Sequence, residues 1–215
     1  MRQELLQEIE RDVRSTSHYT GRHRLHRDVL QAMADVPRHE FVPKEWRDSS
    51  YINRPLPIGE GQTISQPYIV ALMTDLLDPQ ADDVILDIGT GSGYQAAVLA
   101  ELVSKVYSME IVPALAESAT DRLERLGYDN VEVRLGNGWQ GWPEHAPYDG
   151  ILVAAGASEL PQKLVEQLKP GAKLIVPLVA GPHGEELTVV EKHEDGSVSR
   201  RSVLPVRFVP MTGEH

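Results

Sequence analysis

The feature that most constrains the fold is an apolar run that leads directly into a glycine-rich loop. Residues 84–88 (VILDI) are predicted to form a buried strand, the loop Gly89–Gly93 (GTGSG) follows, and residues 94–102 are predicted to be helical. A strand that passes through glycines into a helix is typical of a parallel α/β sheet, whose ligands bind beyond the carboxyl ends of the strands. The loop therefore predicts both a fold class and the position of a ligand.

The alternation of strands and helices continues on both sides of this unit. Further helices are predicted over residues 3–13, 25–33, 68–77, 114–126 and 160–168, and further strands over residues 103–109, 131–135, 150–155 and 172–176. After Pro177 the pattern changes, because residues 187–190 and 203–209 are strand-like and Asp195-Gly196 between them signals a turn. We expect an α/β fold with a mostly parallel, seven-stranded sheet, helices on both faces and a C-terminal antiparallel hairpin.

One domain is expected from a chain of 215 residues. Its parts are an N-terminal region (1–67), the α/β core (68–177) and the C-terminal hairpin region (178–215). Residues 37–67 are rich in proline and glycine and are predicted to be irregular, and long loops of this kind in compact domains are usually functional or disordered. The large apolar side chains of this loop are expected to pack on the body of the protein: Phe41, Trp46, Tyr51 and Ile64.

The composition excludes several classes of function. Asp and Glu outnumber Lys and Arg by 32 to 21, and the net charge of −11 disfavours a nucleic-acid partner because it repels phosphates. A chain with no cysteine has no disulfide framework, thiolate nucleophile or Cys-ligated zinc, and no metal site is predicted. The N-terminus is charged, and the longest apolar run, residues 151–157, is far shorter than the ~18 residues of a membrane span. We therefore expect a soluble, cytoplasmic protein with no membrane partner.

The spacing around the glycine loop indicates which ligand it holds. The pattern is G-x-G-x-G, with Tyr94 where a dinucleotide-binding loop has its last glycine, and Asp87 lies just before the loop. Glu110 ends the next predicted strand, where a carboxylate can accept both hydroxyls of a ribose. A carboxylate beside the loop suits an ammonium group and disfavours a pyrophosphate, so the pattern favours S-adenosylmethionine. The alternative is a tight structural turn with no ligand.

A second informative stretch is residues 59–67 (GEGQTISQP). Pro67 suits the first turn of the helix predicted over residues 68–77, so Ser65 is expected at or just before its N-cap. Two interpretations remain open from this local pattern. Ser65 is only a cap, or Ser65 and the helix N-terminus together hold an anion such as a substrate carboxylate.

Five segments in this order resemble a known family, the protein-L-isoaspartate (D-aspartate) O-methyltransferases. The matching segments are residues 37–43 (PRHEFVP), 59–67 (GEGQTISQP), 88–100 (IGTGSGYQAAVLA), 136–149 (GNGWQGWPEHAPYD) and 207–210 (RFVP). The resemblance implies an α/β, Rossmann-like methyltransferase fold in which the last two strands are swapped relative to other methyltransferases. It also implies that S-adenosylmethionine is the cofactor and S-adenosyl-L-homocysteine the product.

The resemblance further implies an activity and a set of site residues. The α-carboxyl of an L-isoaspartyl residue in a damaged protein would become a methyl ester, which closes to a succinimide and reopens partly as normal aspartate. Isoaspartyl proteins and peptides would be the partners of a monomeric enzyme, with the substrate side in residues 1–67 and the cofactor in residues 68–177. Ser65 would be the catalytic serine, and Ser65 and Val209 would bind substrate. The expected cofactor-binding residues are Thr63, Ile64, Asp87, Gly89, Thr90, Gly91, Ser92, Gly93, Glu110, Asn137 and Gly138.

Three positions depart from the usual pattern of that family. Asp87 stands where Glu is usual, Asn137 where Asp is usual, and Ala154 where Thr is usual. They keep two alternatives open: a methyltransferase for another carboxylate, such as an Asp in a dedicated peptide, or a non-catalytic adenosylmethionine-binding relative. If Asn137 contacts the adenine amino group, we expect Asn137→Asp to tighten cofactor binding by about 1 kcal/mol.

Overall fold

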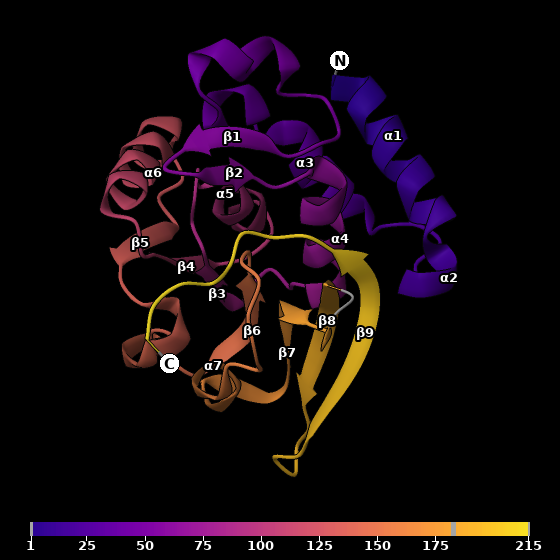
Figure 1. Cartoon of the computed structure of the whole chain (residues 1–215), viewed down its shortest axis with the longest axis vertical. Coiled ribbons are helices and arrows are strands. Elements are labelled where there is room, and N and C mark those ends of the chain that lie inside the picture. The colour runs from indigo at the N-terminus through magenta and orange to yellow at the C-terminus, as the bar shows by residue number, and fades with distance from the viewer. Residues whose placement is uncertain (1, 182–183, 215) are drawn as a thin grey trace.

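A computed structural model describes residues 2–181 and 184–214 of the chain. Its main feature is a seven-stranded sheet in the order β5-β4-β3-β6-β7-β8-β9 (Figure 1). The first five strands in this order are parallel, and β8 and β9 are antiparallel to their neighbours. The predicted sheet and C-terminal hairpin are therefore confirmed. The strands are β3 (Val84–Ile88), β4 (Lys105–Glu110), β5 (Val131–Leu135), β6 (Tyr148–Val153), β7 (Leu168–Val179), β8 (Glu185–Lys192) and β9 (Val198–Val206).

Helices cover both faces of the sheet, as the alternating pattern predicts. Successive side chains of β3 point to opposite faces, so Ile85 packs in one apolar cluster and Leu86 in the other. The first cluster includes side chains of α1, α3, α4, α5 and α6, and the second includes those of α7 and of the 3-10 turns near Trp139 and Trp142. The helices are α1 (Arg2–Ser15), α2 (Ser17–Thr20), α3 (Arg27–Asp35), α4 (Pro67–Leu77), α5 (Tyr94–Ala100), α6 (Pro113–Leu126) and α7 (Gln162–Glu166).

The proline-rich segment 37–67 is more regular than predicted. It contains two 3-10 helices, Arg38–Phe41 and Lys44–Ser49, and a short antiparallel hairpin of β1 (Leu56–Gly59) and β2 (Gln62–Ile64). Such short strands carry little periodicity in the sequence, and their pairing is set by a turn in which three successive residues, 59–61, have positive φ. Phe41 and Ile64 are buried, and Trp46 and Tyr51 pack against the first cluster, which confirms that the segment lies on the body.

Some element boundaries differ from the predicted ones. The helix predicted over residues 160–168 ends at Glu166, because β7 begins at Leu168 and its irregular first part passes through Pro170-Gly171. At the C-terminus, β9 ends at Val206 rather than at Val209. Residues after Val206 leave the sheet and cross back over it towards the edge formed by β5 (Figure 1). This crossing brings Val209 to the ligand side of the sheet.

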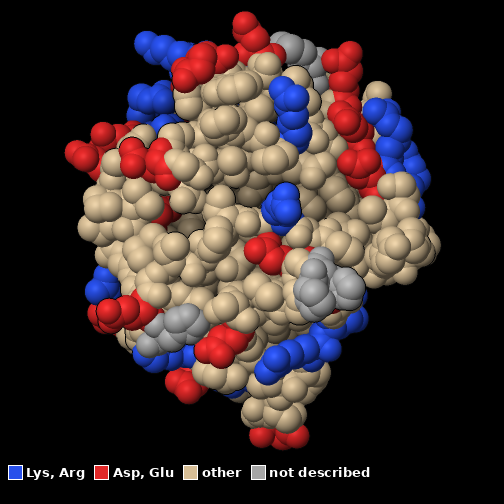
Figure 2. Space-filling view, in the orientation of Figure 1, with Lys and Arg blue, Asp and Glu red and all other residues tan. Residues whose placement is uncertain are grey.

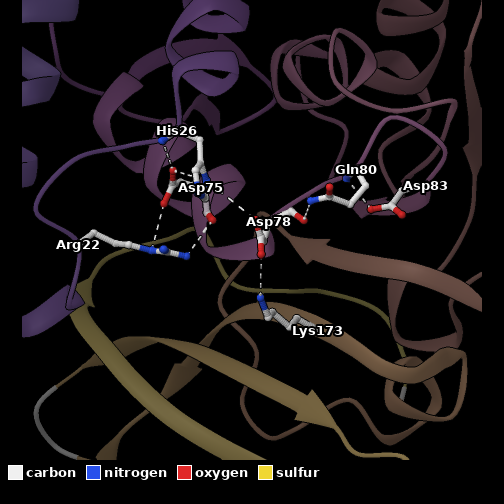
Figure 3. Close-up of polar contacts among 7 residues, drawn as sticks. All are labelled: Arg22, His26, Asp75, Asp78, Gln80, Asp83 and Lys173. Atoms are coloured by element: carbon white, nitrogen blue, oxygen red, sulfur yellow. Dashed lines mark hydrogen bonds and ion pairs between the residues drawn. The ribbon is translucent and has the colours of Figure 1, made fainter.

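A buried carboxylate joins the N-terminal helices to the core (Figure 3). Asp75 of α4 is fully buried, and its Oδ1 accepts a hydrogen bond from the backbone N–H of His26 at 2.7 Å. Its Oδ2 lies 3.1 Å from Nε of Arg22. At the end of the same helix, Asp78 lies 3.7 Å from the Lys173 ammonium of β7. A buried carboxylate held by a hydrogen bond and an ion pair fixes the segment between α2 and α3 against α4.

Candidate active site

The loop Gly89–Gly93 folds over the carboxyl ends of β3 and β4. The N–H groups of Gly89 and Thr90 donate to the carbonyl of Met109, at 2.8 and 3.1 Å. Gly91 has φ +54°, and Gly93 begins α5 with φ +86°, values in the left-handed region that favours glycine. A Cβ on Gly93 would lie 3.2 Å from the side chain of Leu123. The glycines therefore let the loop turn sharply and stay close to the helices behind it.

The carboxylate of Glu110 is fixed by three backbone N–H groups. Its Oε2 accepts from Gly91 at 2.7 Å, and its Oε1 accepts from Ile111 and Val112, both at 2.9 Å. An ionised carboxylate offers about four acceptor sites, so room for a further donor remains. Glu110 also lines a cavity beside the loop, and its role in binding ribose hydroxyls there stays a prediction.

This first cavity lies between the glycine loop and the C-terminal segment. It is lined by Ile88 and Met109 at the ends of β3 and β4, and by residues 209–212. A Cβ on Gly138 would lie 2.5 Å from the Ile88 side chain, so the chain bearing this glycine approaches the cavity closely. A glycine cradle, a fixed carboxylate and apolar walls fit the ribose and adenine of S-adenosylmethionine.

The predicted cofactor residues fall into three groups. The first cavity is lined by Thr63, Gly89, Gly91, Glu110 and Gly138, together with Val209. A smaller adjoining cavity is lined by Ile64, Thr90 and Ser92, together with Ser65. Three residues are not among those that line either cavity in the described structure: Asp87, Gly93 and Asn137. Gly93 supports the loop from behind, and Asp87 and Asn137 form hydrogen bonds with other residues of the chain.

Asp87 is fully buried between β3 and β4. Its Oδ2 accepts a hydrogen bond from the Ser108 hydroxyl at 2.7 Å, and the Ser108 oxygen lies 2.7 Å from the Thr90 hydroxyl. Its Oδ1 has no hydrogen-bond partner among the described residues. Burial, opposed by the Ser108 hydrogen bond and assisted by Glu110, raises the pKa of Asp87 to about 7. Asp87 therefore connects to the loop through two hydroxyl groups.

Ser65 lies at the entrance to α4 but does not cap it. The N-cap residue is Gln66, and no side-chain hydrogen bond closes this helix end. The backbone carbonyl of Ser65 accepts a 2.8 Å hydrogen bond from Nη2 of Arg38, whereas its hydroxyl makes no hydrogen bond within the described part of the chain. Of the two interpretations that the sequence left open, the geometry disfavours the one in which Ser65 is only a cap.

A larger second cavity of about 570 Å³ adjoins the first. The two cavities share three residues as walls, Thr63, Ala154 and Val209, and Ser65 lines the second. Val209 is held in place because its carbonyl accepts a 2.8 Å hydrogen bond from Gly156. Figure 2 shows that this face of the molecule is hollowed near its middle. The second cavity has room for part of a peptide, and Ser65 lines it close to the walls that it shares with the first cavity.

Asn137 follows β5 and holds two backbone groups. Its Oδ1 accepts from the N–H of Trp139 at 3.0 Å, and its Nδ2 donates to the carbonyl of Glu214 at 2.6 Å. Both atoms of the amide are thus engaged within the chain. Its neighbour Gly138, and not Asn137, lines the first cavity. A contact between Asn137 and adenine stays a prediction.

Sequence reasoning missed several residues that shape the site. Arg38 is fully buried, supports the Ser65 carbonyl and lies 4.7 Å from the centre of the Tyr94 ring. The sequence signal that could have identified Arg38 is its position in residues 37–43, one of the five segments that resemble the family. Met211 and Thr212 line the first cavity, and Asp12 of α1 lines the second.

No group of three or more potential metal ligands occurs in the described residues, and no described helix is long and apolar enough to cross a membrane.

The chain is similar to known proteins along nearly its whole length. A family model described as protein-L-isoaspartate (D-aspartate) O-methyltransferase matches residues 15–215. The chain is 57% identical to protein-L-isoaspartate O-methyltransferase 2 of Syntrophobacter fumaroxidans over 215 residues, which are 100% of this chain and 87% of that one. It is 56% identical to protein-L-isoaspartate O-methyltransferase 2 of Nitrosococcus oceani, over 99% of this chain and 96% of that one.

Two solved structures share the fold along nearly the whole chain. A protein-L-isoaspartate O-methyltransferase superposes with a TM-score of 0.84 and 28% identity, over 99% of this chain and 66% of that one. A protein-L-isoaspartate O-methyltransferase of Plasmodium falciparum, in complex with S-adenosyl-L-homocysteine, superposes with a TM-score of 0.80 and 25% identity, over 98% of both chains. The chain belongs to the protein-L-isoaspartate (D-aspartate) O-methyltransferase family.

Proposed function

We propose that this protein methylates the α-carboxyl of L-isoaspartyl residues, with S-adenosylmethionine as the methyl donor and S-adenosyl-L-homocysteine as the product. The ester then closes to a succinimide with loss of methanol, and water reopens the ring partly to normal aspartate, so the reaction starts the repair of damaged proteins. The observation that carries the proposal is the position of Ser65. Ser65, whose hydroxyl makes no hydrogen bond to the described residues, lines the second cavity beside the walls that this cavity shares with the first.

The reaction requires little of the protein beyond positioning the substrate carboxylate against the methyl group. The bound cofactor supplies an electrophilic methyl group on a sulfonium. A carboxylate with a reference pKa near 4 is already ionised at neutral pH, so no strong general base is needed. The Ser65 hydroxyl would donate a hydrogen bond to the substrate carboxylate. This bond would orient a carboxylate oxygen of the substrate towards the methyl group. Orientation of this kind can supply as much as ~7–11 kcal/mol of the barrier reduction.

The residues that would hold the cofactor follow the order of its parts. Glu110 would accept the ribose hydroxyls, Gly138 would lie against the adenine, and the loop Gly89–Gly93 would surround the amino acid tail. Asp87 would favour the cationic cofactor through its charge, although it stands behind the loop. With a net charge of −11, the protein would act on isoaspartyl proteins rather than nucleic acids. We expect it to do so as a monomer in the cytoplasm.

One assay tests the proposal against its alternatives. Methyl transfer from labelled S-adenosylmethionine is measured to an isoaspartyl peptide and to its twin with a normal aspartate. We expect the isoaspartyl peptide alone to be methylated. Transfer to the aspartyl twin would indicate a methyltransferase for another carboxylate. Cofactor binding without transfer to either peptide would indicate a non-catalytic relative.

A further inference from the structure

The N-terminal helix forms part of the wall of the second cavity. Asp12, Ser15 and Thr16 all line this cavity, and their spacing places them on one face at the end of α1. The family model matches the chain only from residue 15 onward, so Asp12 precedes the matched region. α1 therefore adds a negatively charged side chain to the cavity in which we place the substrate.

Hydrogen bonds fix the end of α1 against the first turn of α4. The Asp12 carboxylate accepts from Nδ2 of Asn53 at 2.7 Å, and Oδ1 of Asn53 accepts from the N–H of Tyr68 at 3.0 Å. The Tyr68 hydroxyl lies 2.5 Å from the Thr16 hydroxyl. Because Tyr68 follows Ser65 by three residues, these contacts hold the carboxylate of Asp12 at a set position relative to Ser65.

The charges of the second cavity come from two different elements. Among the described residues that line it, Asp12 is the acidic one, and Arg207, just after β9, is the basic one. Arg207 is exposed and forms no ion pair within the described part of the chain. A bound peptide would therefore meet a cation at one place and a carboxylate at another. Charges arranged in this way select substrates by complementarity.

We propose that Asp12 is a specificity-determining residue that favours isoaspartyl substrates with a Lys or Arg beside the isoaspartate and disfavours those with an acidic neighbour. The proposal rests on the proposed function. Asp12 is half-buried, and an ion pair at such a site changes a binding constant by at most about fivefold. The carboxylate of Asp12 would bind the side chain of the neighbouring residue, whereas Ser65 would bind the carboxyl group that is methylated.

The test measures kcat/KM for two isoaspartyl peptides that differ only in having Lys or Glu beside the isoaspartate. We expect the native enzyme to prefer the Lys peptide by about threefold to fivefold, mainly through KM, and to lose most of this preference at about 1 M salt. Asp12→Asn should bring the ratio close to one, because Asn keeps an oxygen for Asn53 but carries no charge. Asp12→Lys should invert the ratio.

A matched control separates a local effect from a change of net charge. Glu10 is exposed on the same helix, two residues away and on another side, so Glu10→Gln removes one negative charge outside the cavity. We expect Glu10→Gln to keep the native ratio. An equal ratio in the native enzyme and in Asp12→Asn, or the same change in both variants, would overturn the role of Asp12. Failure to methylate either isoaspartyl peptide would overturn the proposed function itself, and this specificity with it.

Discussion

The side-chain amide of Asn137 donates a 2.6 Å hydrogen bond to the main-chain carbonyl of Glu214. Gln140 donates to the same carbonyl at 3.2 Å. A Cβ on Gly213 would lie 2.5 Å from Oδ1 of Asn137, so the C-terminal segment passes directly against this side chain. The C-terminal segment is thus held at two places, at Pro210 by its bridge to Gly156 and at Glu214 by Asn137, and Met211 and Thr212 between them line the first cavity.

This contact changes what we expect from Asn137→Asp. A carboxylate cannot donate a hydrogen bond, so the substitution places a negative charge against the Glu214 carbonyl and loosens the C-terminal segment. Instead of tighter cofactor binding, we expect an affinity loss on the order of 1 kcal/mol, which is up to about tenfold. Titration calorimetry with S-adenosylmethionine measures it. In a chain that lacks residues 213–215, Asn137→Asp should not lower the affinity for S-adenosylmethionine. A loss of affinity that persists in the shortened chain would contradict the explanation.

Ser65→Ala should abolish most methyl transfer and leave cofactor affinity unchanged. The Ser65 hydroxyl lines the second cavity and is not engaged within the described chain, so its removal takes nothing from the folded structure. The matched control is Ser15→Ala, which removes a hydroxyl from another wall of that cavity and should keep turnover. Equal losses of turnover and cofactor affinity in Ser65→Ala would instead make Ser65 a cofactor residue.

Glu110→Ala should weaken S-adenosylmethionine binding by roughly 2–4 kcal/mol, because each hydrogen bond to a charged group contributes about 1.5–3 kcal/mol. The loss has two sources in this structure. The ribose loses its acceptor, and the N–H of Gly91 loses the carboxylate that fixes the loop. Glu110→Gln keeps one oxygen and should have a smaller effect. Unchanged affinity of Glu110→Ala in a calorimetric titration would place the ribose elsewhere.

The stability of the protein should depend on pH through Asp87. Burial raises the pKa of Asp87 to about 7, whereas the carboxyl of an unfolded chain titrates near 4. Between about pH 4 and pH 7 the folded state therefore keeps a proton that the unfolded state has lost, so the free energy of unfolding should fall as pH rises through this interval. Asp87→Asn should remove this part of the slope in urea denaturation series.

The same residue should make cofactor binding depend on pH. An ionised Asp87 attracts the cationic cofactor better than a protonated one does, so the affinity for S-adenosylmethionine should rise as pH increases through about 7 in the native protein. The affinity of Asp87→Asn should be flat over that range. A parallel rise in both proteins would assign the titration to another group.

Arg38→Lys should destabilise the protein by about 1–3 kcal/mol and lower turnover. The guanidinium of Arg38 is fully buried and donates to the carbonyls of Ser50 and Ser65, both at 2.8 Å. The shorter reach and single nitrogen of a lysine cannot serve both carbonyls, so a buried acceptor is left unpaired. The nearby exposed Arg54 provides the control, because Arg54→Lys should change neither quantity. Thermal denaturation and the methyl-transfer assay give the two readouts.

The sequence by itself determined the elements that depend on local chemistry. The apolar run of β3, the glycines of the loop and the helix after it lie within 17 consecutive residues, so hydrophobic periodicity and turn chemistry predict them almost to the residue. Pro67 likewise placed the start of α4 and hence Ser65 beside it. The same periodicity predicted all seven strands of the large sheet.

Only the tertiary structure decided which side chains meet at the site. Asn137 and Glu214 are 77 residues apart, Arg38 and Ser65 are 27 apart, and Asp12 reaches Asn53 over 41 residues. A single polar contact carries no periodic signal, and its formation depends on how the packed elements orient the two groups. The hairpin of β1 and β2 was missed for a related reason, because strands of four and three residues show almost no alternation. Local patterns thus specify the elements, and packing over long sequence separations specifies the contacts between them.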